Sequence, residues 1–202
     1  MNEPDSGSVE ELEPIGPGGI AEPQPAVSRR DNILRLILEV VAIVAAAFLL
    51  ALLIQLFVLK PYVIPSPSME PTLVEGDRVL VSRLTYHFRD PVRGDVVVFD
   101  PPEAMEGSPP LIKRVVAVGS DTVSVHNGTL WVNGVAQDEP FIKEYPIFDE
   151  FPEVTIAPGY VWVMGDNRNN SGDSRRFGQV PEESIIGAAF CIYWPLAHID
   201  GL

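Results

Sequence analysis

One long apolar run constrains this chain more than any other feature of the sequence. The run extends from Ile33 to Leu59, and only Glu39 and Gln55 interrupt its core, Leu36–Leu59. As a helix this core is about 36 Å long, enough to cross a hydrocarbon layer about 30 Å thick. A cleavable signal peptide has a shorter apolar core and a small-residue cleavage site, whereas Lys60 and Pro61 follow here. The sequence therefore predicts a transmembrane anchor helix over residues 31–60.

The basic residues beside this run predict its orientation. Arg29, Arg30 and Arg35 lie at its N-terminal end, and Lys60 is the one basic residue directly after it. Cytoplasmic flanks carry an excess of Lys and Arg. We therefore expect a single-pass protein of the cell membrane, with residues 61–202 outside the cytoplasm. Residues 1–30, rich in Glu, Pro and Gly, are expected to form a disordered, acidic cytoplasmic tail.

Charge and cysteine content exclude two classes of protein. The formal net charge of −14 argues against a nucleic-acid partner, because binding phosphates requires a basic surface. The one cysteine, Cys191, cannot form an internal disulfide. A domain outside the cytoplasm must then rely on its own core, and the apolar context of Cys191 predicts an ordinary buried side chain.

Beyond the anchor the pattern predicts a mainly β, mostly antiparallel domain. Short β-branched runs end at Gly, Pro, Asn or Asp, and no long amphipathic helix is expected. Asn127-Gly128 and Asn133-Gly134 predict tight reversals within a small inserted hairpin region at about 119–160. Proline-rich 100–110 is expected to be an exposed loop between two strands. The runs are "RVLVSR", "GDVVVFD", "LIKRVVAVG", "DTVSVHNGTLWVNGVAQ", "EVTIAPGYVWVMGD" and "IIGAAFCIYW".

The segment after the anchor, "VIPSPSMEPTL", holds Ser66 and Ser68 among three prolines. Proline fixes φ and biases the preceding residue toward extended geometry. In an extended segment residues i and i+2 project to the same side, so we expect the two hydroxyls to share one small volume. By itself "SPS" also fits a proline-rich juxtamembrane linker.

Lys113 occupies an unusual place in "LIKRVVAVG". Strand alternation puts Lys113 on one face and Arg114 on the other, so whichever face is buried takes a cation with it. An edge strand with its charge in water is the alternative. A buried lysine has a lowered pKa and can act as a general base. Beside a serine it would form a Ser-Lys dyad, with Ser68 as nucleophile.

Four ordered stretches resemble the bacterial type I signal peptidases, membrane-anchored serine proteases that remove signal peptides from exported proteins. Four blocks in this order, after one anchor, are a specific signature, and the resemblance runs from about residue 30 to the C-terminal region. The stretches are "IPSPSMEPTL", "RGDVVVF", "IKRVVAVGSD" and "MGDNRNNSGDSRRFGQVPEESIIGAA". One departure is Pro67, where glycine is frequent in the family.

The resemblance implies a role for each matching residue. By this resemblance Ser68 would be the nucleophile and Lys113 the general base. The Ser66 hydroxyl would form the oxyanion hole with the Ser68 backbone N–H. Ser171 matches a serine that hydrogen-bonds and orients the lysine.

Further charged residues match the family's motifs. Asp173 and Arg175 match a structurally important charged pair near the site. The motif residues Asp166, Asn167 and Arg168, with Arg93 and Asp95, are expected to have scaffold roles. Lys143 is read as a loop residue with Glu144 nearby.

The resemblance also implies the partners. These are the signal peptides of preproteins at the membrane surface and the lipid bilayer itself, with no metal or other cofactor required. An exposed apolar surface near the active site is expected to associate with the bilayer, although a core role for each candidate residue is equally open. The candidates are Val63, Ile64, Met69, Leu73 and Trp194.

Two alternative functions stay open at this point. A membrane-tethered β module that binds partners without catalysis would retain the fold and lose the activity. A Ser-His-Asp hydrolase would use His87, His126 or His198, but the sequence places each of them in a turn, near a chain end or between strands.

Replacing the three histidines with Gln tests the histidine-dependent alternative. We expect the triple variant His87→Gln, His126→Gln and His198→Gln to cleave a preprotein at close to the wild-type rate, because a lysine replaces histidine as the base. The measurement is preprotein cleavage in detergent. Abolished cleavage in a folded triple variant would overturn the Ser-Lys dyad.

Overall fold

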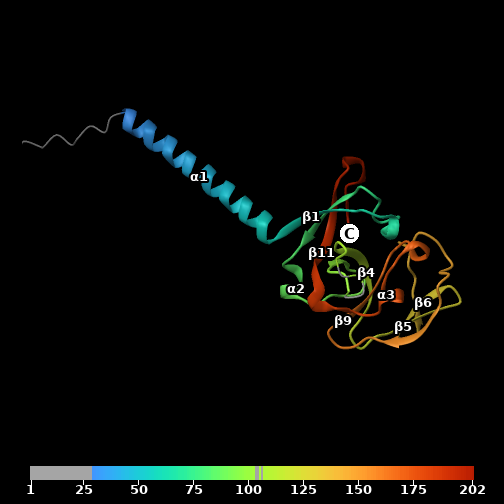
Figure 1. The fold of residues 1–202 in the computed structure, drawn as a ribbon. Helices are drawn as coiled ribbons and strands as arrows, with labels where there is room; N and C mark the ends of the chain where they lie inside the picture. Colours follow the sequence, from blue (N-terminus) through green and yellow to red (C-terminus); the bar gives the residue numbers. More distant parts are fainter. Residues whose placement is uncertain (1–28, 103–104, 106) are drawn as a thin grey trace, which may run out of the picture. The chain divides into compact units, whose positions relative to one another are not determined.

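The apolar run as far as Phe57 forms one helix, α1 (Arg29–Phe57), in the computed structural model of the chain, which describes residues 29–102, 105 and 107–202 (Figure 1). The segment Asn32–Ile54 has a mean hydropathy of 3.0, and none of its most apolar window is buried. By length and composition it is a candidate membrane span. The disorder predicted for the N-terminal tail falls on residues 1–28, which lie outside the described residues.

The larger of two antiparallel sheets has the strand order β1-β2-β11-β3-β4-β9-β10, with β12 paired to β11. This arrangement confirms the predicted mainly β, mostly antiparallel fold. The strands are β1 (Leu59–Val63), β2 (Arg78–Ser82), β3 (Val96–Phe99), β4 (Leu111–Val118), β9 (Tyr160–Met164), β10 (Val180–Pro181), β11 (Ile185–Trp194) and β12 (Asp200–Gly201).

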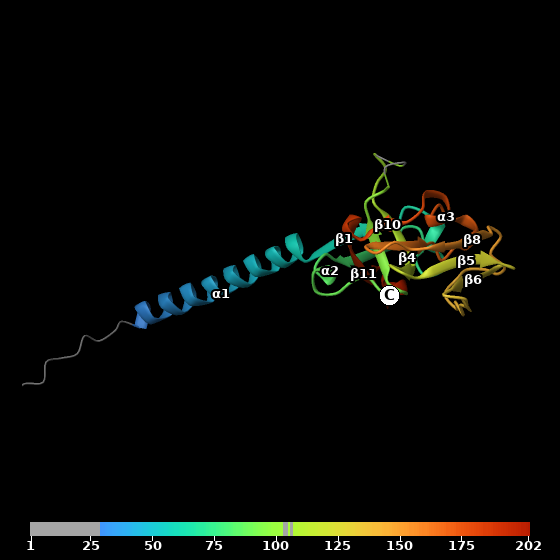
Figure 2. The ribbon, with the colours of Figure 1, turned by 90° about the horizontal axis from the view of Figure 1, so that it is seen from below.

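The second sheet, ordered β7-β6-β5-β8, is inserted in the sequence between β4 and β9. In both ribbon views it continues beyond β4 on the side away from β1 (Figure 2). Asn127 and Asn133 have φ of 51°, and the glycine after each has φ of 72°. Both Asn-Gly reversals are thus confirmed as two-residue hairpin turns. The strands are β5 (Thr122–His126), β6 (Thr129–Val132), β7 (Val135–Ala136) and β8 (Phe151–Thr155).

Helices after residue 61 are short throughout the described part of the chain, as the sequence predicts. Each has three or four residues, and most cap a turn between strands. They are η1 (Pro67–Met69), α2 (Thr85–Phe88), η3 (Arg168–Asn170), α3 (Ser174–Phe177), η4 (Glu182–Ser184) and η5 (Leu196–His198).

Strand β1 is one of the strands that the sequence patterns miss. It pairs with β2 from Leu59 to Val63, directly after the helix. Pro61 fits here because β1 is at the edge of the sheet, where a missing N–H costs no ladder hydrogen bond. This edge strand leads straight into the "PSPS" segment.

The core settles which apolar residues near that segment are exposed. Ile64, Met69 and Leu73 are buried in a cluster with residues of β2, β3 and β11, so the structure gives them core positions. Val63 and Trp194 are 60% and 47% exposed. Cys191 is a free, half-buried thiol rather than a fully buried one.

Candidate active site

The turn that carries Ser68 is built differently from the predicted extended segment. Ser66 is extended, with φ −151° and ψ 157°, but Pro67–Met69 forms the 3₁₀ turn η1. The prediction was wrong from Pro67 onward because a proline whose φ is already helical also starts a helical turn well. The expected result still holds: the Ser66 and Ser68 hydroxyl oxygens are 3.3 Å apart.

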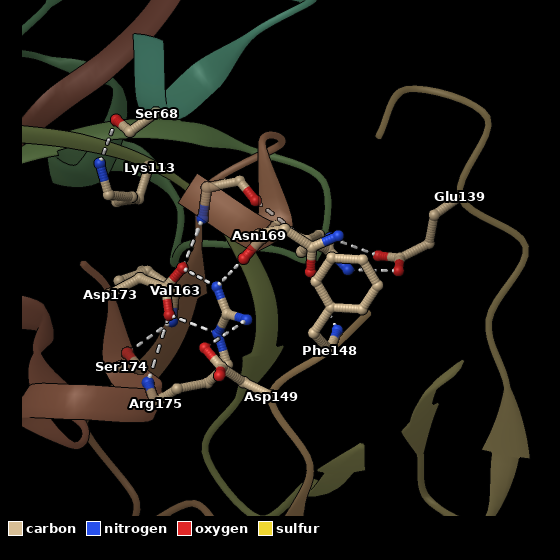
Figure 3. Close-up of polar contacts among 12 residues, drawn as sticks. Ser68, Lys113, Glu139, Phe148, Asp149, Val163, Asn169, Asp173, Ser174 and Arg175 are labelled. Atoms are coloured by element: carbon tan, nitrogen blue, oxygen red, sulfur yellow. Dashed lines mark hydrogen bonds and ion pairs between the residues drawn. The ribbon is translucent and has the colours of Figure 1, made fainter. Parts of the chain in front are cut away.

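Lys113 reaches this turn from the middle of the larger sheet. Its strand, β4, lies between β3 and β9, and the residue is 3% exposed. Nζ lies 2.7 Å from Ser68 Oγ and donates to the Ile112 carbonyl oxygen at 2.9 Å. Figure 3 shows the Lys113 side chain directed at Ser68. Burial lowers the pKa of Lys113 to about 8, against the opposing pull of Asp173 and Asp166.

Both cations of β4 are buried, although strand alternation suggested that only one would be. Lys113 and Arg114 are 3% and 8% exposed, so the edge-strand alternative is wrong. The reason is that β4 is a central strand with packed layers on both faces. Arg114 is fully compensated: its Nε and Nη2 donate to Asp166 at 2.9 and 2.7 Å.

Lys113 differs from Arg114 in lacking a direct carboxylate partner. Within the described part of the chain it forms no ion pair, and its near contacts are a hydroxyl and a carbonyl oxygen. A buried ammonium without a counter-ion is costly, so this environment favours the neutral amine. The site therefore presents a base and a hydroxyl in contact, both of them buried.

The loop after β9, residues 165–168, holds the Ser68 turn in place. The Asn167 N–H donates to the Ser68 carbonyl oxygen at 3.1 Å, and Asn167 Nδ2 donates to the Pro67 carbonyl oxygen at 3.0 Å. Gly165 packs so closely that a Cβ there would lie 2.3 Å from the Ser68 carbonyl oxygen. Only glycine allows this approach.

Ser171 lies next to the same glycine, but one expected contact is missing. A Cβ on Gly165 would lie 2.3 Å from Ser171 Oγ, which places this hydroxyl beside the Ser68 turn. Ser171 Oγ is buried without a hydrogen-bond partner among the described residues. The hydrogen bond to Lys113 implied by the resemblance is thus not formed here, because Nζ is directed to Ser68 and the Ile112 carbonyl. The supporting role of Ser171 stays a prediction.

Asp173 and Arg175 form a buried ion pair behind the site. The carboxylate accepts from Arg175 Nε and Nη2, each at 2.8 Å, and from the Gly165 N–H at 3.0 Å. Figure 3 shows Asp173 and Arg175 joined in this network. Arg175 also donates to the Arg168 carbonyl oxygen at 2.6 Å, so the pair ties α3 to the loop at residues 165–168.

Sequence reasoning missed the setting of Lys143. Its partner is Glu70, at 2.7 Å, rather than the neighbouring Glu144. Glu70 follows Ser68 by two residues, so this lysine contacts the candidate site from another part of the chain. Separation in sequence hid the pair, because its members are 73 positions apart.

Two of the three histidines have partners away from Ser68. His198 Nδ1 lies 2.9 Å from an Asp77 carboxylate oxygen, and the His126 ring stacks on Trp131 with centroids 4.5 Å apart. Neither contacts Ser68, and His87 lies in α2. In the described structure the position beside Ser68 belongs to Lys113.

Comparison with known proteins gives a consistent family assignment. The family model described as "Signal peptidase, peptidase S26" matches residues 37–194. A probable signal peptidase I-1 of Synechocystis sp. is 42% identical over 79% of this chain and 84% of its own length. Signal peptidase I of Leptolyngbya laminosa is 38% identical over 90% of each chain. A solved signal peptidase I from Enterococcus faecalis V583 is 28% identical, with a TM-score of 0.43 over 50% of this chain and 97% of that one.

Replacing Lys113 with Met is expected to change how stability depends on pH. The folded-state pKa of Lys113 is about 8 and its ordinary value is 10.5, so the unfolded chain binds more protons between these pH values. Lys113 therefore makes stability rise with pH across this window. Relative to Lys113→Met, the wild type should gain about 3 kcal/mol, since each tenfold change in proton affinity corresponds to ~1.4 kcal/mol.

The measurement is denaturant unfolding of the detergent-solubilised wild type and variant on both sides of this pH window. All other groups titrate in both proteins, so the difference isolates Lys113. A difference in unfolding free energy that stays constant with pH would contradict a buried lysine with a lowered pKa.

Proposed function

The chain belongs to the signal peptidase family, peptidase S26, and from this we propose that it is a membrane-anchored serine endopeptidase that removes signal peptides from exported preproteins. The contact that carries the proposal is the 2.7 Å approach of Lys113 Nζ to Ser68 Oγ. A nucleophile and a base within hydrogen-bond reach are the minimum for activated-nucleophile catalysis.

In this proposal Lys113 reacts as the neutral amine. Before the reaction, the Ser68 hydroxyl then donates a hydrogen bond to the Nζ lone pair, while an N–H of the amine donates one to the Ile112 carbonyl oxygen. Oγ attacks the peptide carbonyl carbon as Nζ takes the proton. The C–N bond breaks when the protonated Lys113 returns that proton to the leaving amine. Water, deprotonated by the same Nζ, then attacks the acyl carbon; the ester C–O bond breaks, and the protonated Lys113 returns the proton to Ser68 Oγ.

The proposed oxyanion hole uses the Ser66 hydroxyl and the Ser68 backbone N–H. Ser66 Oγ lies 3.3 Å from Ser68 Oγ, so its hydroxyl is close to where the carbonyl oxygen develops charge. Donors fixed before the reaction stabilise that charge without reorganising. The Asn167 contacts to Pro67 and Ser68 support this fixed geometry.

The candidate span and two exposed residues at one end of the strands β1 and β11 support the membrane part of the proposal. Val63 and Trp194 are both register partners of Arg78, on β1 and β11, so they flank the same β2 residue. Their exposure makes this end of the strands a candidate lipid-facing surface. The arginines at the start of α1 favour a cytoplasmic N-terminus, with the β domain on the outer side. Sharing one membrane raises the effective concentration of enzyme and substrate.

Alanine variants of the two dyad residues test the proposed function. We expect Ser68→Ala and Lys113→Ala each to lower preprotein cleavage by at least about 10³-fold, because triad-type residues act as one unit. The measurement is cleavage of a preprotein in detergent or lipid, with thermal unfolding to confirm folding. Inactive wild-type protein, though folded, would instead favour the non-catalytic module.

The pH profile tests the identity of the base. The neutral fraction of Lys113 falls about tenfold per pH unit below its pKa, so kcat/KM should fall likewise below about pH 8 and level off above it. Cleavage rates across the acid and alkaline range provide the measurement. A rate that is flat well below neutrality would exclude a lysine base.

A further inference from the structure

A segment outside both sheets makes contacts that the dyad alone does not explain. This segment, residues 139–143 or "EPFIK", follows β7 and is called the strap here. Two of its side chains, Glu139 and Ile142, are buried at 4% and 8% exposure. A connecting loop normally lies on the surface with its polar groups in water. The strap instead packs against the elements that carry the site.

Its first contact is a buried ion pair between Glu139 and Arg168. Arg168 is 0% exposed; its Nη2 donates to Glu139 Oε1 at 2.7 Å, and its Nη1 donates to Oε2. Arg168 Nε also donates to the Gly165 carbonyl oxygen at 3.0 Å. Figure 3 shows Glu139 at the edge of this network, on a segment of the chain separate from the one that carries Asp173. Glu139 therefore fixes Arg168, which in turn bonds to Gly165 at the other end of the loop at residues 165–168.

The second contact secures the same loop through its backbone. The Lys143 N–H donates to the Asp166 carbonyl oxygen at 3.0 Å. The Arg114 guanidinium, which pairs with the Asp166 carboxylate, lies over the Phe141 ring at 4.2 Å from its centroid. These contacts hold the strap against the loop without any contribution from the Lys143 side chain.

The third contact reaches the Ser68 turn. Lys143 Nζ lies 2.7 Å from Glu70 Oε2. Glu70 closes the turn, because its N–H donates to the Pro67 carbonyl oxygen at 3.1 Å. The strap therefore holds both sides of the contact between Asn167 and Ser68: the loop through Glu139 and the turn through Lys143.

We propose that the strap is a positioning element for catalysis, in which Glu139 and Lys143 act through Arg168 and Glu70 to keep the Ser68 hydroxyl aligned with Lys113. This inference rests on the proposed function, since it assigns a role in the same reaction. An exposed ion pair contributes little stability, but here its lysine backbone is already anchored, so the side chain restrains the turn. Small misplacements of a nucleophile are costly, up to about 10² in rate for 1 Å.

Breaking the exposed pair is the first test. We expect Lys143→Met to lower kcat for preprotein cleavage by about tenfold and to leave KM within about twofold, because alignment rather than binding is lost. The charge exchange Lys143→Glu with Glu70→Lys should restore kcat to within about threefold, since the attraction is rebuilt. A conserved melting temperature in all three proteins would separate alignment from folding.

The matched control is Arg89→Met. The Arg89–Asp95 pair has the same 2.7 Å separation, and its cation is 43% exposed against 45% for Lys143. This control is expected to cleave at the wild-type rate. Equal losses in both variants, or a charge exchange that restores nothing, would overturn the proposal.

A second measurement does not depend on activity. Lys143→Met and Glu139→Gln should each accelerate hydrogen exchange at the Glu70 and Asn167 amides by about tenfold or more, because these amides report on the turn and its clamp. Exchange in β11 should be unchanged. If Glu139→Gln fails to fold, Lys143→Met still decides, because its pair is exposed.

The two measurements also separate this inference from the proposed function. If the wild type had no peptidase activity but Lys143→Met still accelerated exchange, the strap would stand as a restraint on the turn and the proposed reaction would be rejected. Unchanged exchange in Lys143→Met, alongside an active wild type, would reject the strap and leave the Ser68–Lys113 dyad standing.

Discussion

The rest of the site depends on one unfavourable placement: a lysine amine buried in the centre of a sheet without a carboxylate of its own. The central position of β4 removes water from Lys113, and the near contacts offer only a hydroxyl and a carbonyl oxygen. Desolvation then works in favour of the uncharged form. A stable fold would gain by replacing such a group with an apolar one, as buried ionic groups often show. The sheet therefore carries a local cost that makes chemical sense only beside Ser68.

The neighbouring carboxylates offset only part of the cost of burying the Lys113 amine, since its pKa is still lowered. Asp166 and Asp173 both raise the pKa of Lys113, yet each carboxylate is already bonded to an arginine. Arg114 takes both oxygens of Asp166, and Arg175 takes both oxygens of Asp173. Bidentate pairs of this kind are among the stronger charge-assisted hydrogen bonds and fix the carboxylate in place. The acidic groups near Lys113 are thus paired with arginines rather than with the lysine itself.

Local patterns in the sequence predicted much of the fold. The apolar run gave the helix, the β-branched runs gave the main strands, and Asn127-Gly128 gave a hairpin turn, because each depends on neighbours a few residues away. What failed was set by tertiary context. Alternation in "LIKRVVAVG" could not show that both faces of β4 are covered. The path of the Ser68 turn, the partner of Lys143 and the unpaired hydroxyl of Ser171 depend on segments brought together only by the sheet.

The inserted sheet gives this arrangement its last element. The contact between Lys113 on β4 and Ser68 on a short 3₁₀ turn has few neighbours to resist small displacements, because η1 spans only three residues. Asn167 holds that turn by donating to the carbonyl oxygens of Pro67 and Ser68, but Asn167 itself lies on a loop. The strap arrives from the second sheet and fixes that loop through a fully buried arginine, and the turn through Glu70. Contacts from both sheets thus restrain the three residues of η1, as a preorganised Ser68 hydroxyl requires.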